Sequence, residues 1–522
     1  MKKYRWWAVA LTLVFIACYL DSAVAIVQQD TFPVEVDLSQ MPYFPPIGDQ
    51  GNLGSCASWS VGYYANGFLQ AKIHEWNDTY SGNPSHLMSP SWIYNKVNFN
   101  SDVNIMGSAT TWCIDLILSV GAASMTAMPY NENNSVDWGN ESAWREAPLY
   151  RIGGYEQTTS NDIDLIKSWI KEEHLVSFGI DSTQMKAGIS DDNFVVSYFE
   201  YNETKKNHAV TIVGYNDSVS DDGDRGAFKV ANSWGNEWGD NGFFWMTYHA
   251  MDKIASGLDL GGFNDPKAYR LLPKNSDMSP YQPKLLGVWE FSVAPDATSS
   301  IELGIGSPES PVNTRSPEWI KIHSDLPTFM CLDISEFNQD FSSGTRDFYL
   351  RILPGIKIGV IESFTIESYD EKYILGNPIG ISKESTGPIS MTPAIMTVNF
   401  NPPKADFTYM ASDAKNNQIF FSDKSISSEG SITKWVWNFG DGEISSEQNP
   451  SHTYEKLGEY TVKLIAVDET GDKGICGSII TIQSQLESSG PIERTTPPAG
   501  GVFLVGCLLF SGMLYHSKRK VN

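Results

Sequence analysis

The first half of the chain shows two patterns of apolar residues, one with the periodicity of helices and one typical of strands. After Cys56, apolar residues recur mostly at intervals of three and four positions, at Trp59, Tyr63, Tyr64, Phe68 and Ala71. Such spacing predicts a buried helix. The stretches 209–215 and 226–231 are short, have the composition of strands and are bounded by Gly, Asn and Asp, which predicts strands. We therefore expect a mixed α+β domain over residues 26–264.

Beyond residue 265 the helical periodicity of apolar residues is no longer present. Short apolar or alternating runs lie between clusters of Gly, Pro, Asn and Ser, at 287–293, 300–305, 346–352 and 358–368. This is the pattern of an all-β domain, and a β-sandwich over residues 265–401 is the architecture that it favours. Two adjacent prolines, Pro402 and Pro403, mark the end of this domain.

A second all-β unit is expected over residues 402–486. Trp435, Trp437 and Phe439 occupy alternate positions, so one face of a strand presents all three side chains. The following residues, 487–498, are rich in Ser, Pro, Gly and Thr and have the composition of a linker.

Both ends of the chain have the character of targeting segments. Residues 1–25 combine basic residues, an apolar run and a small-residue cleavage pattern, which predicts a signal peptide. Residues 499–515 contain no charged side chain and are long enough to cross a thin bilayer as a helix. The basic tail 516–522 predicts a cytoplasmic C-terminus, with everything before the helix outside the cell. The expectation is a single-pass cell-surface protein, with a C-terminal sorting signal as the alternative for the apolar segment.

Composition excludes several classes of function. The chain has 522 residues with 37 basic and 62 acidic side chains, a net charge of -25. A surface this acidic repels phosphate backbones, so nucleic acid is not an expected partner. The six cysteines are scattered and include no CxxC pair, which argues against both a disulfide scaffold and a zinc ribbon.

Four polar residues form a candidate catalytic set. Cys56 opens the expected helix, His208 precedes a strand, and Asn232 follows the next strand. A free thiol is mostly neutral at physiological pH, and a helix N-terminus together with an imidazolium favours the thiolate. The Asn carbonyl can orient the imidazole. Gln50, six residues before Cys56, can supply an oxyanion donor alongside the Cys56 backbone N–H.

The segments around these residues resemble the papain family of cysteine peptidases. They are Gln50 to Trp59, Asn207 to Val210, and Asn232 to Gly239. The resemblance implies that Cys56 is the nucleophile, His208 the general base and acid, Asn232 the orienting group and Gln50 the oxyanion donor. It also implies that Trp234 shields the His–Asn bond, and that Gly107 and Asn207 border the substrate cleft. The segment 128–130 is expected beside the same cleft.

This sequence departs from the family pattern in three respects. Leu53 stands where the family usually has a disulfide cysteine, and Ala57 replaces the usual aromatic residue after the nucleophile. The stretch between Ile26 and Cys56 is too short for the family's helical inhibitory pro-region. We therefore expect no structural disulfide in this domain, and we expect control of activity by some route other than such a pro-region.

The last β unit resembles a PKD domain, an immunoglobulin-like module. The matching blocks are 437–442, 449–454 and 458–462. The middle β domain resembles, through segments 347–352 and 361–369, the lectin-like sandwich that follows papain-like domains in some prokaryotic surface proteins. The whole combination is similar to cell-surface peptidases of prokaryotes, of the archaeal type. Carbohydrate or protein ligands of the β domains are therefore a hypothesis.

Three functions are compatible with these features. The first is a surface-anchored cysteine endopeptidase acting on protein or peptide substrates through an acyl-enzyme. The second is an adhesion protein with a silent peptidase domain, and the third is an acyl transferase that uses the same thioester chemistry. No cofactor is expected. The run Asp221 to Asp224 has ligands suited to Ca²⁺, but a solvated acidic loop is the interpretation we favour.

Overall fold

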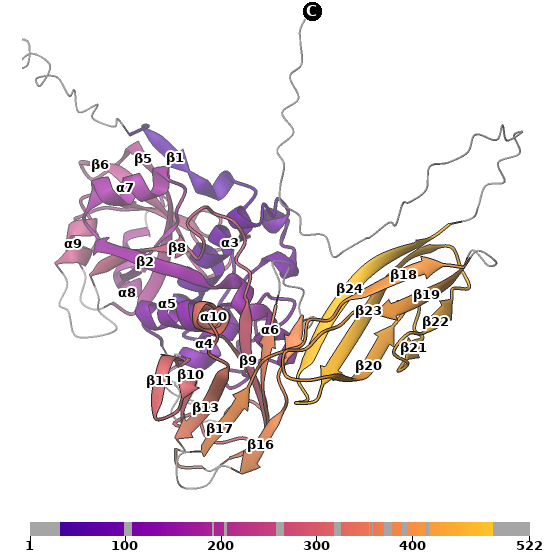
Figure 1. Ribbon diagram of the computed structural model, residues 1–522. Coiled ribbons are helices and arrows are strands. Elements are labelled where there is room, and N and C mark those ends of the chain that lie inside the picture. Colours follow the sequence, from indigo (N-terminus) through magenta and orange to yellow (C-terminus); the bar gives the residue numbers. More distant parts are fainter. Residues whose placement is uncertain are drawn as a thin grey trace, which may run out of the picture.

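The computed structural model divides into three parts (Figure 1). It describes residues 32–98, 107–189, 193–202, 206–256, 266–317, 325–353, 355–357, 359–369, 378–388, 394–412 and 417–483. The expected signal peptide, linker, membrane helix and tail lie outside these residues. Within the described ranges, no helix is both long and apolar enough to cross a membrane.

A central helix carries the core of the first domain. It begins as α2 (Cys56–Ser58), continues with π-helical pairing as η2 (Trp59–Asn66) and ends as α3 (Gly67–Ile73). The expected helix after Cys56 is confirmed. All eight residues of η2 are buried, so the helix is enclosed on every side rather than on one face. The other helices of this domain are α4 (Pro90–Val97), α5 (Thr110–Ser119), α6 (Glu141–Glu146), α7 (Ile163–Lys171), α8 (Ser182–Gly188) and α9 (Met251–Ala255).

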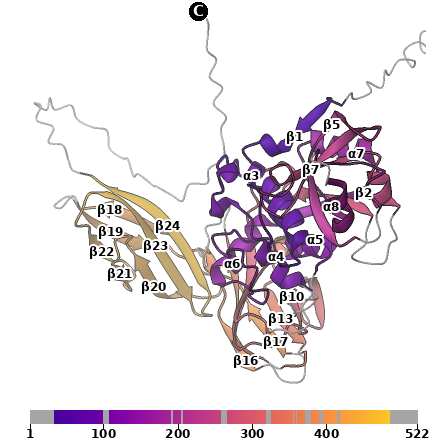
Figure 2. The ribbon, with the colours of Figure 1, turned by 180° about the vertical axis from the view of Figure 1, so that it is seen from behind.

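An eight-stranded sheet forms the other half of this domain, as Figure 2 shows from behind. Its order is β2-β8-β3-β5-β6-β7-β4, with β1 paired to β5. The strands are β1 (Glu35–Asp37), β2 (Ile152–Thr159), β3 (Val176–Ile180), β4 (Val195–Val196), β5 (His208–Asp221), β6 (Asp224–Ala231), β7 (Phe243–Thr247) and β8 (Lys267–Pro273). The first eight residues of β5 are buried, because the strand runs through the middle of the sheet.

The expected domain boundary at residue 265 is too early. Strand β8 pairs with β2 and β3 and so completes the sheet of the first domain. An alternating strand has the same sequence pattern whichever sheet it joins, so the pattern could not assign β8. The middle domain therefore begins after Pro273.

The middle domain is a sandwich of two antiparallel sheets. One has the order β11-β10-β13-β17, and the other begins β12-β9-β14-β15, with β16 also paired to β14. The strands are β9 (Leu285–Val293), β10 (Ser300–Ser307), β11 (Ser310–Arg315), β12 (Phe329–Asp333), β13 (Asp347–Leu353), β14 (Val360–Ser368), β15 (Gly380–Ile381), β16 (Ser385–Pro388) and β17 (Ala394–Asn399). A short helix, α10 (Asn338–Ser342), follows β12.

The middle sandwich shares one continuous hydrophobic core with the first domain. Charged pairs reinforce this junction. Arg145 of α6 binds Glu367 of β14 through both terminal nitrogens, at 2.8 and 3.2 Å. Arg151 binds Asp333 at the end of β12, and both side chains are almost fully buried. The two domains therefore form one packed body rather than two independent units.

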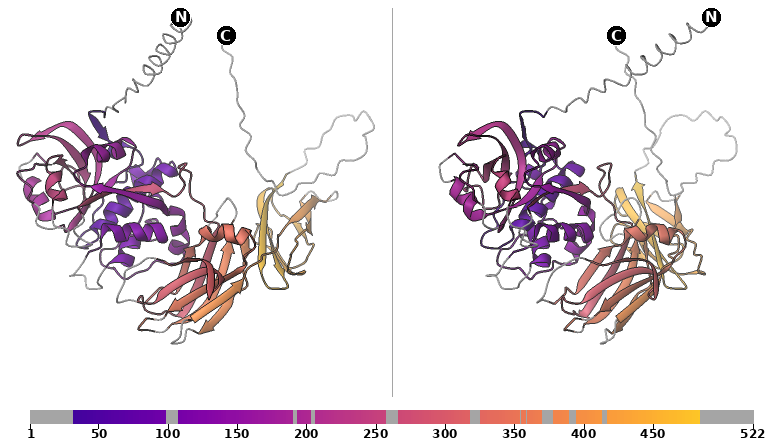
Figure 3. Two further views of the ribbon diagram at one scale, coloured as in Figure 1. Left: turned by 60° about the vertical axis from the view of Figure 1, so that its left-hand side comes forward. Right: turned by 90° about the vertical axis from the view of Figure 1, so that its left-hand side faces the viewer.

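The C-terminal sandwich has a core of its own, built around Trp437, Tyr454 and Leu464. Its strands are β18 (Phe407–Ala411), β19 (Gln418–Asp423), β20 (Ile432–Asn438), β21 (Ile444–Ser445), β22 (Ser451–Thr453), β23 (Gly458–Asp468) and β24 (Lys473–Ile482). The two-residue strand β15 pairs with β14 on one side and β24 on the other, so one sheet runs through both sandwiches (Figure 3).

Candidate active site

Cys56 occupies the first residue of the central helix, at the point where the helix meets the sheet. Its backbone N–H and that of Ala57 have no acceptor within the helix, as is usual at a helix N-terminus, and such donors favour negative charge. The side chain is half-buried and is a free thiol. The other cysteines of the described residues, Cys113, Cys331 and Cys476, are also free thiols.

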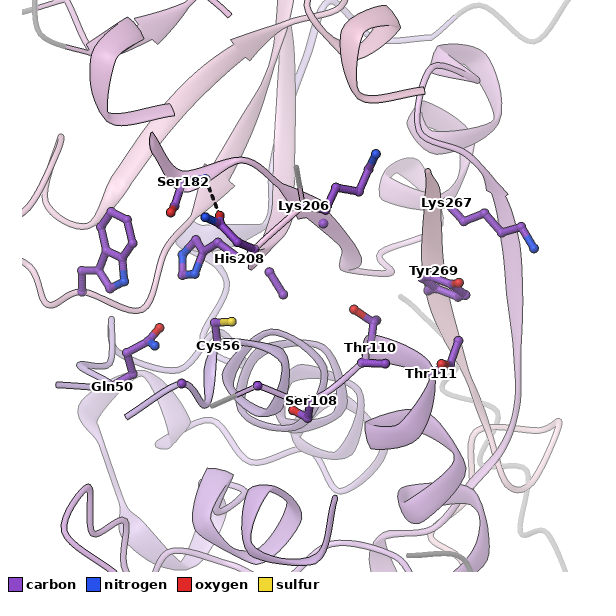
Figure 4. A pocket seen from close by; sticks show the side chains of 17 residues that line it. Gln50, Cys56, Ser108, Thr110, Thr111, Ser182, Lys206, His208, Lys267 and Tyr269 are labelled. Atoms are coloured by element: carbon purple, nitrogen blue, oxygen red, sulfur yellow. Dashed lines mark hydrogen bonds between the residues drawn. The ribbon is translucent and has the colours of Figure 1, made fainter. Parts of the chain in front are cut away.

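His208 and Asn232 lie on adjacent strands of the sheet. His208 is the first residue of β5, and Asn232 follows the last residue of β6, which runs antiparallel to it. The imidazole Nε2 and the Asn232 Oδ1 are 2.7 Å apart. This bond leaves Nδ1 for the thiol, and Figure 4 shows the imidazole directly across from Cys56. The strand pairing thus brings together two residues that are 24 positions apart in sequence.

Two tryptophans cover this pair. The Trp234 ring stacks on the His208 imidazole with a centroid distance of 4.6 Å. Trp238 meets Trp234 edge to face at 5.1 Å. Asn232 is 1% exposed and His208 7% exposed, so the hydrogen bond between them is shielded from water.

The Gln50 side chain is held beside the same cavity. Its Oε1 accepts a hydrogen bond from the Ser233 hydroxyl at 2.6 Å, and its Nε2 donates to the Leu53 carbonyl at 2.8 Å. Because a primary amide carries two N–H groups, one remains for a ligand. The Gln50 backbone N–H also binds the Ser233 carbonyl, at 2.8 Å, which joins this loop to the segment after Asn232.

Two tyrosine hydroxyls support the loop, and sequence reasoning missed this role. Tyr130 donates to the Gln50 carbonyl at 2.8 Å and lies 2.7 Å from the Ser55 hydroxyl. Tyr64 donates to the Asn232 carbonyl and accepts from the Gly48 N–H, at 2.8 and 3.0 Å. The segment 128–130, which was expected beside the substrate cleft, lines a second hollow and not the cavity at Cys56.

The cavity at this site has a volume of about 410 Å³. Gln50, Cys56 and His208 lie at one end in Figure 4, and Thr110, Thr111 and Tyr269 at the other. Trp234 lines the cavity beside His208, on which it stacks. Gly107 and Asn207 also line it. The Asn207 Oδ1 accepts from the Ser182 backbone N–H at 2.9 Å, the bond drawn dashed in the figure. Asn207 thus ties β5 to α8.

Burial disfavours the charged forms of both the Cys56 thiol and the His208 imidazole. Desolvation raises the pKa of the Cys56 thiol, and hydrogen bonds from the backbone of Ala209, Ala57 and Cys56 itself oppose that rise. Desolvation lowers the pKa of His208 to about 4, with the Asn232 bond opposing and the Lys186 charge adding to the effect. Each group alone therefore prefers to be neutral, so burial opposes the thiolate that the helix N-terminus and an imidazolium together would favour.

The acidic run 221–224 divides between two environments. Asp224 accepts from Thr247, from the Tyr198 backbone N–H and from His249. Asp221 and Asp222 instead gather with Glu200, and oxygen atoms of the three lie within 4.8 Å of one another. These carboxylates could hold a divalent cation, but they lie outside the lining of the catalytic cavity.

Comparison with known proteins assigns two parts of the chain. Residues 32–257 match the family described as "Papain family cysteine protease", and residues 400–482 match the family described as "PKD domain". Vignain of Ricinus communis is 28% identical over 235 residues, which are 43% of this chain and 57% of vignain. Collagenase ColQ1 of Bacillus cereus (strain Q1) is 36% identical over 99 residues, 19% of this chain and 10% of the collagenase.

Among solved structures, the Amb a 11 cysteine protease, a ragweed pollen allergen in its proform, is 18% identical with a TM-score of 0.34. The match covers 48% of this chain and 69% of the allergen chain. The chain thus spans little more than half of vignain and a tenth of the collagenase.

Proposed function

We propose that this chain, in which a papain-family cysteine peptidase domain precedes a PKD domain, is an exported cysteine endopeptidase anchored at the cell surface. The observation that carries the proposal is the arrangement at one end of the cavity. A thiol opens a helix there, and it faces an imidazole that is already oriented by a buried amide at 2.7 Å.

In the proposed reaction, the His208 Nδ1 takes the proton of the Cys56 thiol as the sulfur attacks a peptide carbonyl. The resulting imidazolium then gives that proton to the leaving amine, and an acyl-enzyme remains on the sulfur. Water attacks this thioester with His208 again acting as the base, which releases the acid and restores the thiol. Asn232 holds the imidazole in one orientation throughout, because its Oδ1 accepts the Nε2–H.

Burial of both groups makes the proton transfer a joint event. A separate thiolate or a separate imidazolium is disfavoured in this site, as the two pKa shifts indicate. Transfer of the proton from the Cys56 thiol to the His208 imidazole creates a thiolate and an imidazolium in contact, so each charge stabilises the other. The pair therefore titrates as a unit rather than as two independent groups.

The oxyanion is proposed to bind between Gln50 and the helix start. The remaining Gln50 Nε2–H and the Cys56 backbone N–H would each donate one hydrogen bond to the developing charge. The Ser233 hydroxyl holds the Gln50 amide by donating to its Oε1. The Leu53 carbonyl can only accept, so the amide atom that it contacts is the nitrogen.

Export and anchoring rest on the sequence of the two ends and on the β domains. The basic N-terminus with its apolar run, and the apolar C-terminal segment with its basic tail, agree on one topology. The PKD-family match fits an extracellular protein. The two sandwiches would then hold or dock the peptidase, with a cell-surface carbohydrate or protein as the ligand class.

The test is to incubate the purified full chain with a proteome-derived peptide library and to identify the products by mass spectrometry. Cleavage is expected in the wild type and is lost in Cys56→Ala and after treatment with a thiol-directed epoxide. An added amine that appears in the products instead of water would support acyl transfer. A wild type that cleaves nothing and does not react with the epoxide would favour the adhesion protein.

A further inference from the structure

Lys186 stands over the tryptophan that walls the catalytic cavity. Its Nζ lies 4.3 Å from the centre of the Trp234 ring, and the same ring stacks on His208 and lines the cavity. The electrostatic effect of Lys186 reaches the imidazole, where it helps to lower the pKa of His208. An exposed cation is therefore within electrostatic reach of the reacting groups.

Helix α8 keeps this cation in position. Asp181, which is fully buried, caps the helix by accepting from the backbone N–H groups of Thr183 and Gln184. Met185, next to Lys186, is also fully buried and anchors the helix to the core. The attraction between the ammonium and the indole face then restricts Lys186 to the space above Trp234.

Within the part of the chain that the structure describes, the Lys186 ammonium has no ion-pair partner. No Asp or Glu lines the neighbouring cavity. Two other lysines, Lys206 and Lys267, line the cavity itself, whereas Lys186 stands outside that lining, over the Trp234 ring. Lys206 donates to the Ile254 carbonyl at 2.9 Å, and Lys267 lies at the far end beyond Tyr269 in Figure 4. In a chain of net charge -25, a cation without an ion-pair partner among the described residues thus stands at the Trp234 end of this cavity.

We propose that Lys186 makes this peptidase favour substrates with a carboxylate in the half of the peptide that leaves. His208 gives its proton to the leaving amine, and Trp234 flanks the imidazole, so that half of the peptide runs past Trp234. An acidic side chain there would replace water around the ammonium. The inference rests on the proposed function and names the substrate class of the same site.

The expected size of the effect follows from the exposure of the lysine. An ion pair at a solvent-accessible site is worth at most about 1 kcal/mol, which corresponds to a preference of about 3- to 5-fold in kcat/KM. Salt screens such a pair, so the preference should shrink as ionic strength rises.

The experiment uses the full chain and pairs of internally quenched peptides with one scissile bond. Within each pair the peptides differ by Glu or Gln at one position, and the series covers three positions on each side of the bond. In this first set of peptides every C-terminus is amidated. A second set has free C-termini close to the scissile bond. The first set measures acidic side chains, and the second measures a terminal carboxylate.

The wild type should prefer Glu over Gln, or a free C-terminus over an amide, by about 3- to 5-fold in the leaving half. Lys186→Gln should bring that ratio close to one, and Lys186→Glu should invert it. The matched control is Lys253→Gln, which removes a similar lysine–aromatic contact, with Tyr198 at 4.2 Å, and should keep the wild-type ratio.

Efficient cleavage with a ratio near one at every position would overturn the inference and leave the proposed function standing. A preference that persists in Lys186→Gln, or that appears only in the acyl half, would overturn it as well. Failure to cleave any peptide would contradict the proposed function, and the inference with it.

Discussion

The hydroxyl of Tyr130 donates a hydrogen bond to the backbone carbonyl of Gln50 over 2.8 Å. The same oxygen is 2.7 Å from the hydroxyl of Ser55, the residue before Cys56. Since the tyrosine proton is used on Gln50, Ser55 is the donor in the second bond. One phenol thus connects the proposed oxyanion donor to the start of the helix that carries the nucleophile.

Tyr130→Phe should therefore lower kcat by about 10-fold while KM changes little, because a displaced donor weakens binding of the transition state more than of the substrate. Steady-state kinetics on one peptide substrate would measure this. Tyr63→Phe is the control, since it removes a similar bond to the Pro46 carbonyl at 2.9 Å. Equal effects of the two substitutions on kcat would show that Tyr130 has only a structural role.

Gln50→Ala should lower kcat by about 10²- to 10³-fold, the usual loss for one oxyanion donor. Cys56 should still react with a small alkylating agent at nearly the wild-type rate, because alkylation requires the thiolate but no oxyanion site. Parallel measurement of peptide hydrolysis and of alkylation separates the two roles. Wild-type kcat in this variant would refute the assignment of Gln50.

The pH dependence should reflect the lowered pKa of His208. The cysteine–histidine pair takes up a proton, and loses its base, as the pH falls through about 4, so kcat/KM should decline only in that range. Lys186→Glu replaces the cation that lowers this pKa by an anion, so the acidic limb should move to higher pH. Profiles of kcat/KM from pH 3 to 7 in the wild type and the variant test the direction. An unmoved limb, or a limb that moves to lower pH, would contradict the prediction.

Asp333→Ala should lower the free energy of unfolding by about 3–5 kcal/mol, because it leaves Arg151 buried without its main partner. The side chains of this pair are 0% and 2% exposed. Asp325→Ala, in the exposed pair with Lys357, should cost at most about 1 kcal/mol. Urea denaturation of both variants provides the comparison. Similar losses in the two would argue against a junction held by buried charge.

Residues 402–483 should fold on their own, because their core is separate from that of the other two domains. Within this fragment, Trp437→Ala should cost about 3–5 kcal/mol and unfold a module of ordinary stability. Trp437 is fully buried, and its Nε1 donates to the Glu447 carbonyl. Trp435→Ala, at a half-buried position, should cost less. Thermal unfolding followed by circular dichroism measures both, and a Trp437→Ala fragment that melts at the wild-type temperature would count against the prediction.

Part of this architecture could be predicted from the sequence, because the patterns that predict it lie within short stretches of the chain. The central helix and the strands that carry His208 and Asn232 have their pattern within a few residues, and the polar residues stand at the ends of those elements. Strand β8 was assigned to the wrong domain because pairing partners leave no trace in an alternating pattern. Tyr130 and Lys186 were missed because each acts on a residue about 50 or more positions away in sequence.

The two-residue strand β15 has a mechanical consequence. The Ile475 N–H binds the Ile379 carbonyl beside it, and the Asp472 carboxylate accepts from the Lys383 and Asn401 backbone N–H groups, all at 2.7 Å. A load applied to the C-terminal sandwich passes through these bonds, and through the covalent connection 400–406, into the middle sandwich, which is packed against the peptidase. Under tension these hydrogen bonds should break before either sandwich unfolds. The two sandwiches would then separate first, between the peptidase and the C-terminal end of the chain.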